Sequence, residues 1–208
     1  SPVAVKELRN FAGGKGKAER FLHREVRALS RVQHPNVVRL YGVCVIDARV
    51  PCVVMGLASH TLESELRDDT LGEPSRLLNL RLLRGIARGM AAVHAQKVVH
   101  RDLKPQNVLI SAEGIPWITD FGLSRSMATT GVSRFGSTAG VAGTLPYKAP
   151  ESLRSRKEGG QIVDYPSDVY AFGILAWYVL TRTPPWEDVE DENGIHMNVR
   201  VGERPVMA

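Results

Sequence analysis

The spacing of apolar residues changes near residue 75 of this 208-residue chain. Before that point a strand is predicted over 3–8, and Val-rich, strand-like segments surround Cys44 and Cys52. After it, apolar residues recur at helical spacing, apart from a long irregular segment over 121–146. The pattern predicts an α+β chain: a small strand-rich part that contains one helix, followed by a larger helical part.

The helix predicted in the first part, over 17–32, carries a charge on its apolar side. Its apolar stripe is formed by Leu22, Val26, Leu29 and Val32. Glu25 falls inside this stripe, and a carboxylate that faces the core is costly unless it is paired. The nearest candidate partner is Lys6 on the preceding strand, whose side chain points the same way as that of Ala4. The pattern alone also allows both charges to be solvated at the surface.

Two short strands, 108–110 and 115–119, are separated by turn residues and predict a β-hairpin. Symmetry about the turn places Asn107 opposite Thr119, so Asn107 and Asp120 converge at the open end of the hairpin. Two hard oxygen ligands close together suit Mg²⁺ that is held partly by substrate phosphates. The hairpin therefore predicts a magnesium site.

Longer helices are predicted over 77–94 and within the apolar run Val169–Leu180. This run of 12 residues is the longest apolar stretch, and a membrane-spanning helix needs roughly 20. It therefore predicts a buried helix, and we expect no membrane segment in this chain.

Composition and charge narrow the class of protein. With 43% hydrophobic and 24% charged residues, the chain lies in the range of soluble globular proteins. The net charge is +5, and the first fifty residues hold ten Lys/Arg against four Asp/Glu, or +6. No aromatic-interleaved basic run accompanies this excess, which favours a solvated basic face over nucleic-acid binding. Two cysteines without a visible secretory signal predict buried free thiols and an intracellular location.

Four motifs carry a resemblance to a known family. His-Arg-Asp-Leu-Lys-Pro-Gln-Asn over 100–107 matches the protein kinase catalytic loop at every defining position. Asp-Phe-Gly over 120–122 follows 18 residues after Asp102, and Ala-Pro-Glu over 149–151 comes after an intervening loop. Val-Ala-Val-Lys over 3–6 matches the strand lysine, with a helical glutamate 19 residues later. Over essentially its whole length the chain resembles a eukaryotic-type protein kinase catalytic domain.

The resemblance implies a two-lobed kinase fold and an ATP-dependent enzyme. It predicts a partial kinase domain over 1–208, with the N-lobe in 1–57 and the hinge and C-lobe in 58–208. The family's first two strands, with their Gly-rich loop, and its last helices have no counterpart in these residues. From this we expect the chain by itself to show little phosphotransfer.

The resemblance also assigns the nucleotide-binding residues. Lys6 would contact the α- and β-phosphates of ATP and Glu25 would hold it, which favours a buried pair over two solvated charges. The remaining candidates around the adenine are Ala4, Gly56, Ala58 and Leu109, with Met55 as the gatekeeper.

The catalytic roles follow from the same motifs. Asp102 would accept or orient the proton of the acceptor hydroxyl, and Lys104 would neutralise the transferred phosphate. Asn107 and Asp120 would hold Mg²⁺, while Asp168, in a predicted buried helix, would hold the backbone of the catalytic loop.

Specificity and regulation are predicted from residues near the irregular segment. Lys104 and Thr144, which would position the substrate, resemble the pattern of Ser/Thr-specific kinases, and the subgroup resembled is the tyrosine-kinase-like group of Ser/Thr kinases. Arg101 implies regulation by phosphorylation of this segment, with Ser137 or Thr138 as the favoured acceptor. The alternative is a merely flexible Gly/Ser/Thr-rich loop.

Two other interpretations of the whole chain stay open. A pseudokinase or scaffold would keep the fold without the chemistry, although the usual losses are absent, since Lys6, Asp102, Asn107 and Asp120 are all present. An inactive gene fragment is the other. The predicted partners are ATP and a protein substrate, and not nucleic acid.

Overall fold

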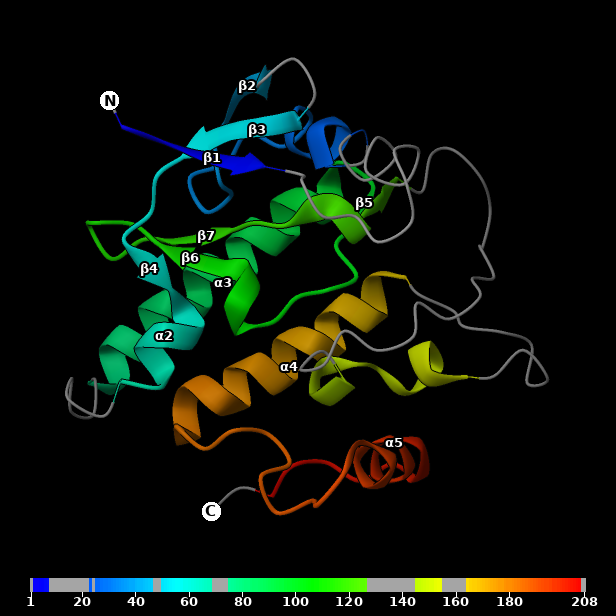
Figure 1. Ribbon diagram of the computed structural model, residues 1–208. Helices are drawn as coiled ribbons and strands as arrows, with labels where there is room; N and C mark the ends of the chain where they lie inside the picture. The colour runs from blue at the N-terminus through cyan, green and yellow to red at the C-terminus, as the bar shows by residue number, and fades with distance from the viewer. Residues whose placement is uncertain are drawn as a thin grey trace.

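The computed structural model describes residues 2–7, 23, 25–46, 50–68, 75–126, 145–154 and 164–206. In Figure 1 the strands of the first part lie at the top and the last helices at the bottom, with a hairpin and a long helix between them. This order along the chain confirms the predicted α+β class. The division of the chain at residues 57 and 58 stays a prediction.

The upper sheet consists of three antiparallel strands in the order β1-β3-β2. They are β1 (Val3–Glu7), β2 (Leu40–Ile46) and β3 (Val50–Gly56). Valines occur in each strand, and β-branched side chains fit a pleated surface well. The register pairs Lys6 with Val53 and Ala4 with Met55, which places Lys6 and Ala4 on the same face of β1 as predicted.

The helix that contains Glu25 is described at residue 23 and over 25–29. It gives way to a turn at residues 30 and 31, before the predicted end at Val32. Ala28, Leu29 and Val32 are nevertheless buried, so the predicted apolar side does face the core. The core side of this helix therefore includes the position of Glu25.

Four further helices are described, and their ends carry capping residues. They are α2 (Leu62–Leu66), α3 (Arg76–Ala95), α4 (Tyr165–Thr181) and α5 (Glu192–Val201). The Ser75 side chain accepts from the backbone N–H of Leu78 at the start of α3. Asp164 and Ser167 form a capping box at the start of α4, which fixes where the helix that contains Asp168 begins.

A small sheet between the two parts supports the candidate site. It contains β4 (His60–Thr61), β6 (Val108–Ile110) and β7 (Pro116–Ile118), in the order β4-β6-β7. A separate ladder pairs β5 (Val98–Val99) with β8 (Arg125–Ser126). Four 3₁₀ turns complete the described elements: η2 (Pro105–Asn107), η3 (Phe121–Leu123), η4 (Leu145–Tyr147) and η5 (Pro150–Leu153).

Helix α3 packs closely under β7, and glycines make the close approach possible. A Cβ added at Gly85 would lie 2.6 Å from Cγ of Pro116, and one at Gly89 would lie 2.6 Å from the carbonyl oxygen of Asn36. Asn36 in turn donates through its side chain to the carbonyl of Pro116. The hairpin that carries Asn107 is thus held against a long helix.

The prediction that α4 is buried is wrong for part of its surface. Val169 is 62% and Leu180 is 45% exposed. The buried residues of α4 recur every three or four positions, so one stripe of the helix faces the core and the opposite stripe does not. Within the described residues, no helix is both long and apolar enough to cross a membrane.

The two cysteines differ, although both were predicted to be buried. Both are free, but Cys52 is buried and Cys44 is exposed. They are directly opposite each other in the register of β2 and β3. Cys52 lies on the central strand, whereas Cys44 lies on a strand at the edge of the sheet.

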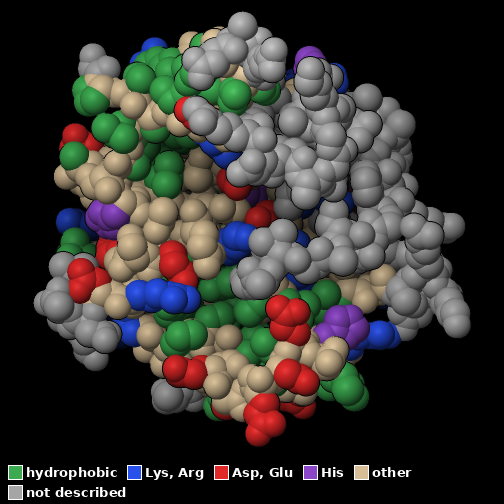
Figure 2. Space-filling model, viewed as in Figure 1, with side chains coloured by type: hydrophobic (Ala, Val, Ile, Leu, Met, Phe, Trp, Pro, Cys, Tyr) green, Lys and Arg blue, Asp and Glu red, His purple; other side chains and the backbone are tan. Residues whose placement is uncertain are grey.

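Figure 2 shows apolar side chains at the surface in this upper region, in agreement with the exposure of Val3, Val5, Tyr41, Val43 and Val45.

Candidate active site

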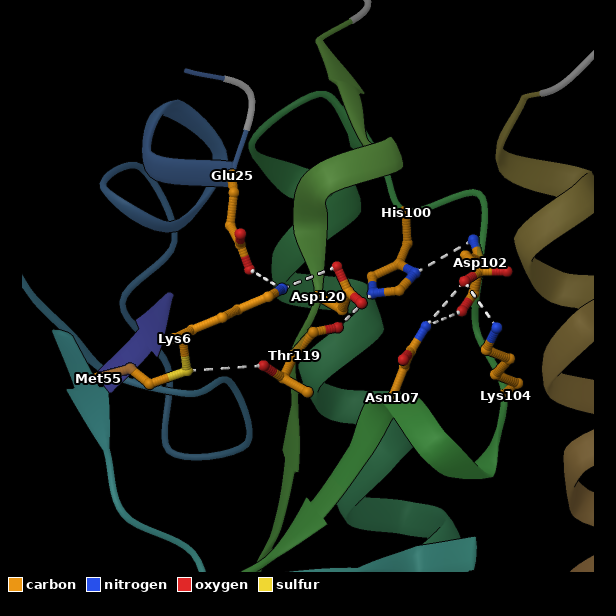
Figure 3. Close-up of polar contacts among 9 residues, drawn as sticks. All are labelled: Lys6, Glu25, Met55, His100, Asp102, Lys104, Asn107, Thr119 and Asp120. Carbon is orange, nitrogen blue, oxygen red and sulfur yellow. Dashed lines mark hydrogen bonds and ion pairs between the residues drawn. The ribbon is translucent and has the colours of Figure 1, made fainter. Parts of the chain in front are cut away.

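Lys6 joins strand β1 to two distant segments (Figure 3). Its Nζ donates to Oε1 of Glu25 at 2.9 Å and to Oδ1 of Asp120 at 3.2 Å. These partners lie 19 and 114 residues away in the chain. The ammonium therefore links the upper sheet, its helix and the end of the hairpin.

Burial and charge act in opposite directions in this cluster. The Glu25 side chain is fully buried, whereas Lys6 is 31% and Asp120 is 36% exposed. Burial raises the pKa of Glu25, and the charge of Lys6 offsets this only in part. Burial also disfavours the charged form of Lys6, but Glu25 and Asp120 outweigh it and raise the pKa of Lys6 above its ordinary value. The pairing predicted from the sequence is confirmed, and two solvated surface charges are not found.

The hairpin brings Asn107 and Asp120 to its open end, as predicted. The register pairs Val108 with Ile118, and the backbone N–H of Thr119 donates to the carbonyl of Asn107 at 3.0 Å. Asp120 follows directly, with a φ of 62° in the left-handed region, which non-glycine residues rarely adopt. This backbone turn begins η3, whose Phe121 is fully buried.

Two side chains of the catalytic loop, those of Lys104 and Asn107, meet at the carboxylate of Asp102 (Figure 3). Its Oδ2 accepts from Nδ2 of Asn107 at 3.0 Å and lies 3.0 Å from Nζ of Lys104. The same amide of Asn107 also donates to the backbone carbonyl of Asp102 at 2.7 Å. Oδ1 is buried and has no hydrogen-bond partner among the described residues. One oxygen of the carboxylate is thus held in place, and the other remains able to accept a proton or a hydrogen bond.

The backbone of the loop is fixed from below by Asp168 of α4. Its carboxylate accepts from the backbone N–H groups of His100 and Arg101, both at 2.8 Å, and contacts Nε2 of His94 at 2.8 Å. Asp168 was predicted to hold the backbone of the catalytic loop, and these two hydrogen bonds do so. It is only 2% exposed, so these hydrogen bonds are shielded from water.

His100 connects the catalytic loop to the end of the hairpin. Its Nδ1 accepts from the backbone N–H of Asp102 at 3.3 Å, so the ring proton belongs on Nε2, which lies 2.9 Å from the carbonyl oxygen of Thr119. The ring also packs edge-on against Phe121 at 4.9 Å. The sequence placed His100 in the catalytic-loop motif but did not predict this bridge.

The predicted adenine-side residues lie on β1, β3 and β6, except for Ala58, which follows β3. Met55 pairs with Ala4 in register, and its sulfur is 4.0 Å from the hydroxyl of Thr119 (Figure 3). Gly56 is buried and donates its N–H to the carbonyl of Arg39 at 3.0 Å. Ala58 and Leu109 are both half-buried. Their contacts with a nucleotide stay predictions.

Comparison with known proteins agrees with this geometry. The family model described as protein kinase domain matches residues 1–206. The chain belongs to the protein kinase family. This identification confirms the resemblance stated from the motifs, and with it the kinase class of the fold.

Curated relatives of the chain are named as kinases. It is 37% identical over 183 residues to the rust resistance kinase Lr10 of Triticum aestivum, covering 84% of this chain and 27% of that protein. It is 30% identical over 206 residues to mitogen-activated protein kinase kinase kinase 12 of Rattus norvegicus, covering 95% of this chain and 21% of that protein. With the serine/threonine-protein kinase Aurora-1 of Arabidopsis thaliana the identity is 31% over 199 residues, or 96% of this chain and 63% of the other. The chain thus spans about a quarter of the length of the first two relatives.

The donor set at the end of the hairpin fits a magnesium ion. Both bonds made by the side chain of Asn107 use its Nδ2, which leaves its carbonyl oxygen able to bind a cation. Asp120 adds a carboxylate that is 36% exposed. Within the described residues no group of three or more His, Cys, Asp and Glu could hold a metal. Two hard oxygens with the other positions taken by phosphate and water is the arrangement that Mg²⁺ favours.

Two residues near the site were missed by prediction from the sequence. His94, near the end of α3, contacts Asp168 across 74 residues, and no local pattern marks it. Lys148 lies 4.0 Å from Oδ1 of Asp102 and donates to the carbonyl of Arg101 at 3.2 Å. Its position directly before the Ala-Pro-Glu motif was the only signal that could have identified Lys148.

The predicted regulatory and substrate-positioning residues are only partly placed. Arg101 is half-buried in the catalytic loop, with a φ of 76°. Thr144, Ser137 and Thr138 lie outside the described residues, so their roles stay predictions.

Proposed function

We propose that this chain carries the phosphotransfer site of a protein kinase that moves the γ-phosphate of ATP to Ser or Thr hydroxyls of protein substrates. The observation that carries the proposal is the carboxylate of Asp102, with Oδ2 held by Lys104 and Asn107 and Oδ1 left without a hydrogen-bond partner among the residues that the structure describes. A general base needs this combination of fixed orientation and a remaining acceptor.

The chemical step then assigns one task to each side chain. Asp102 accepts a hydrogen bond from the acceptor hydroxyl and receives its proton as the oxygen bonds to the γ-phosphorus and the bond to ADP breaks. Lys104, 3.0 Å from the same carboxylate, neutralises negative charge on the transferred group.

The phosphates of ATP would be placed by the second cluster. Lys6 binds them through its ammonium, which Glu25 and Asp120 hold from two sides. When bound between Asn107, Asp120 and the phosphates, Mg²⁺ supplies the positive charge that phosphoryl transfer requires. Asp120 and Lys6 are both partly exposed, which leaves them accessible to a ligand.

Specificity for Ser and Thr is supported by Lys104 and by relatives named as serine/threonine kinases. An intracellular location remains a proposal, and it rests on the need for ATP and on the two free cysteines.

The test is transfer of γ-labelled phosphate to a mixture of Ser, Thr and Tyr peptides by the full-length natural protein that contains this chain. We expect Mg²⁺-dependent labelling of Ser or Thr, and its loss in Asp102→Asn but not in Asp188→Asn, a control at an exposed site. Phosphotyrosine as the main product would contradict the specificity. Nucleotide binding without any transfer would contradict the enzyme function and indicate a nucleotide-binding scaffold.

A further inference from the structure

Lys148 introduces a second lysine at the carboxylate of Asp102. Lys104 approaches Oδ2 at 3.0 Å, and Lys148 approaches Oδ1 from the other side at 4.0 Å. A distance of 4.0 Å is too long for a hydrogen bond, so the contact does not satisfy Oδ1. Lys148 therefore lies beside the oxygen to which an acceptor hydroxyl must come.

The backbone around Lys148 fixes its position. The N–H of Lys148 donates to the carbonyl of Leu145 at 3.0 Å, which closes the turn of η4. Tyr147 is 7% and Ala149 is 1% exposed, so the residues on both sides are packed in the core. The side chain of Lys148 itself remains 31% exposed. It starts from a rigid support and reaches the surface next to the catalytic carboxylate.

The ammonium of Lys148 is incompletely satisfied. Of its three N–H donors, one binds the carbonyl of Arg101 at 3.2 Å, and no other hydrogen bond is found for it among the described residues. Burial lowers the pKa of Lys148, while Asp102 opposes this shift and the nearby charges of Lys104 and Arg101 add to it. The negative charge of an additional anion next to Lys148 would oppose the repulsion by Lys104 and Arg101 and help to offset the cost of burying the ammonium.

Charges around the acceptor position do not cancel. Lys104, Lys148 and Arg101 are cationic, and Asp102 is the carboxylate that faces them. The other nearby carboxylate, Asp168, is occupied by two backbone N–H groups and His94. Among the described residues the three cations outnumber the two carboxylates near Lys148, which favours a further anion there.

We propose that Lys148 is a specificity-determining residue that selects protein substrates with a carboxylate side chain next to the acceptor hydroxyl. The inference rests on the proposed protein kinase function and names the substrate class for that same site. The substrate carboxylate binds the remaining N–H donors of Lys148, while the neighbouring hydroxyl reaches Oδ1 of Asp102. Charge complementarity of this kind discriminates between substrates more than it adds affinity.

Peptide binding tests the inference without requiring turnover. Fluorescently labelled Ser peptides are titrated against the full-length protein. Each peptide carries a single Glu or Gln, either directly before or directly after the serine. We expect one Glu peptide to bind about 3- to 10-fold more tightly than its Gln partner at low salt, the size of a partly exposed ion pair. Lys148→Met should abolish this ratio, and Lys148→Glu should reverse it.

A matched control uses Lys97, an exposed lysine in the turn after α3. Lys97→Met should leave the Glu-to-Gln ratio unchanged. Equal affinities for Glu and Gln peptides in the unsubstituted protein would overturn the inference. So would a loss in Lys148→Met that is the same for every peptide, since that outcome would give Lys148 a structural role.

Transfer rates on the same peptides separate this inference from the proposed function. The Glu preference should appear in KM rather than in kcat, because uniform binding contributes to KM alone, and Lys148→Met should abolish this difference in KM between the Glu and Gln peptides. A Glu preference in binding with no transfer would contradict the enzyme function and support the role of Lys148. Transfer without any Glu preference would contradict the role of Lys148 alone.

Discussion

The two charged clusters of the site are built in different ways. The cluster at Lys6 joins residues 19 and 114 positions apart, and two of its three members are about a third exposed. The cluster at Asp102 comes from one short loop, and its members Asp102, Lys104 and Asn107 are each at most 9% exposed. The buried Asp168 holds the backbone of this loop.

This difference suits the two clusters to two different tasks, orienting the general base and placing the nucleotide. Asp102 is oriented by hydrogen bonds from Asn107 within the same loop, and these bonds do not involve the upper sheet. The contact between Lys6 and Glu25, to which we assign placement of the phosphates, joins distant segments, so a small movement of β1 or of the Glu25 helix would change it. We therefore expect chemistry to be sensitive to the first cluster and nucleotide affinity to be sensitive to the second.

The largest expected effect sharpens the chemical side of this comparison. Asp102→Asn keeps the shape of the side chain but removes its ability to take a proton. Turnover should fall by roughly 10² to 10⁴, about 3 to 5 kcal/mol of barrier. Steady-state rates with a Ser or Thr peptide measure it, and a loss below about 10-fold would argue against a general-base role.

The support of the loop gives the next largest effect. Asp168→Ala removes the acceptor of two backbone N–H groups and the partner of His94, so the free energy of unfolding should fall by about 3 kcal/mol. Urea unfolding measures the change, with the exposed Asp188→Ala as the control. If both variants unfold alike, the loop does not depend on Asp168.

The Lys6 cluster should respond in affinity. Lys6→Met should weaken ATP binding about 10-fold, because a charged contact with phosphate is lost. It also leaves Glu25 buried without its partner, which lowers stability. The double variant Lys6→Met/Glu25→Gln should recover stability but not affinity. Recovery of both properties would mean that Lys6 acts on ATP only through the fold.

Sequence patterns predicted the parts of the site that depend on short-range geometry. The hairpin register follows from one turn, so the placement of Asn107 opposite Thr119 was correct. Glu25 was recognised because a charge inside an apolar stripe needs a partner, and the family motif identified Lys6. In each case the deciding information was a local periodicity or a motif.

Packing between distant segments could not be predicted in the same way. His94 and Lys148 reach the site across 74 and 46 residues, and neither breaks a local pattern. The difference in exposure between Cys44 and Cys52 depends on which strand lies at the edge of the sheet. The sequence of a single strand does not determine its place in the sheet. Likewise, the apolar composition of α4 did not reveal that Val169 and Leu180 face outward.

The central claim is that Asp102 performs chemistry while Asp120 holds the metal and the nucleotide. The most direct measurement titrates Asp102→Asn and Asp120→Asn with a fluorescent ATP analogue, with and without Mg²⁺, and records turnover on the same samples. We predict that Asp102→Asn loses turnover and keeps the Mg²⁺-dependent affinity, whereas Asp120→Asn loses both. Equal losses of nucleotide affinity in the two variants would contradict the account.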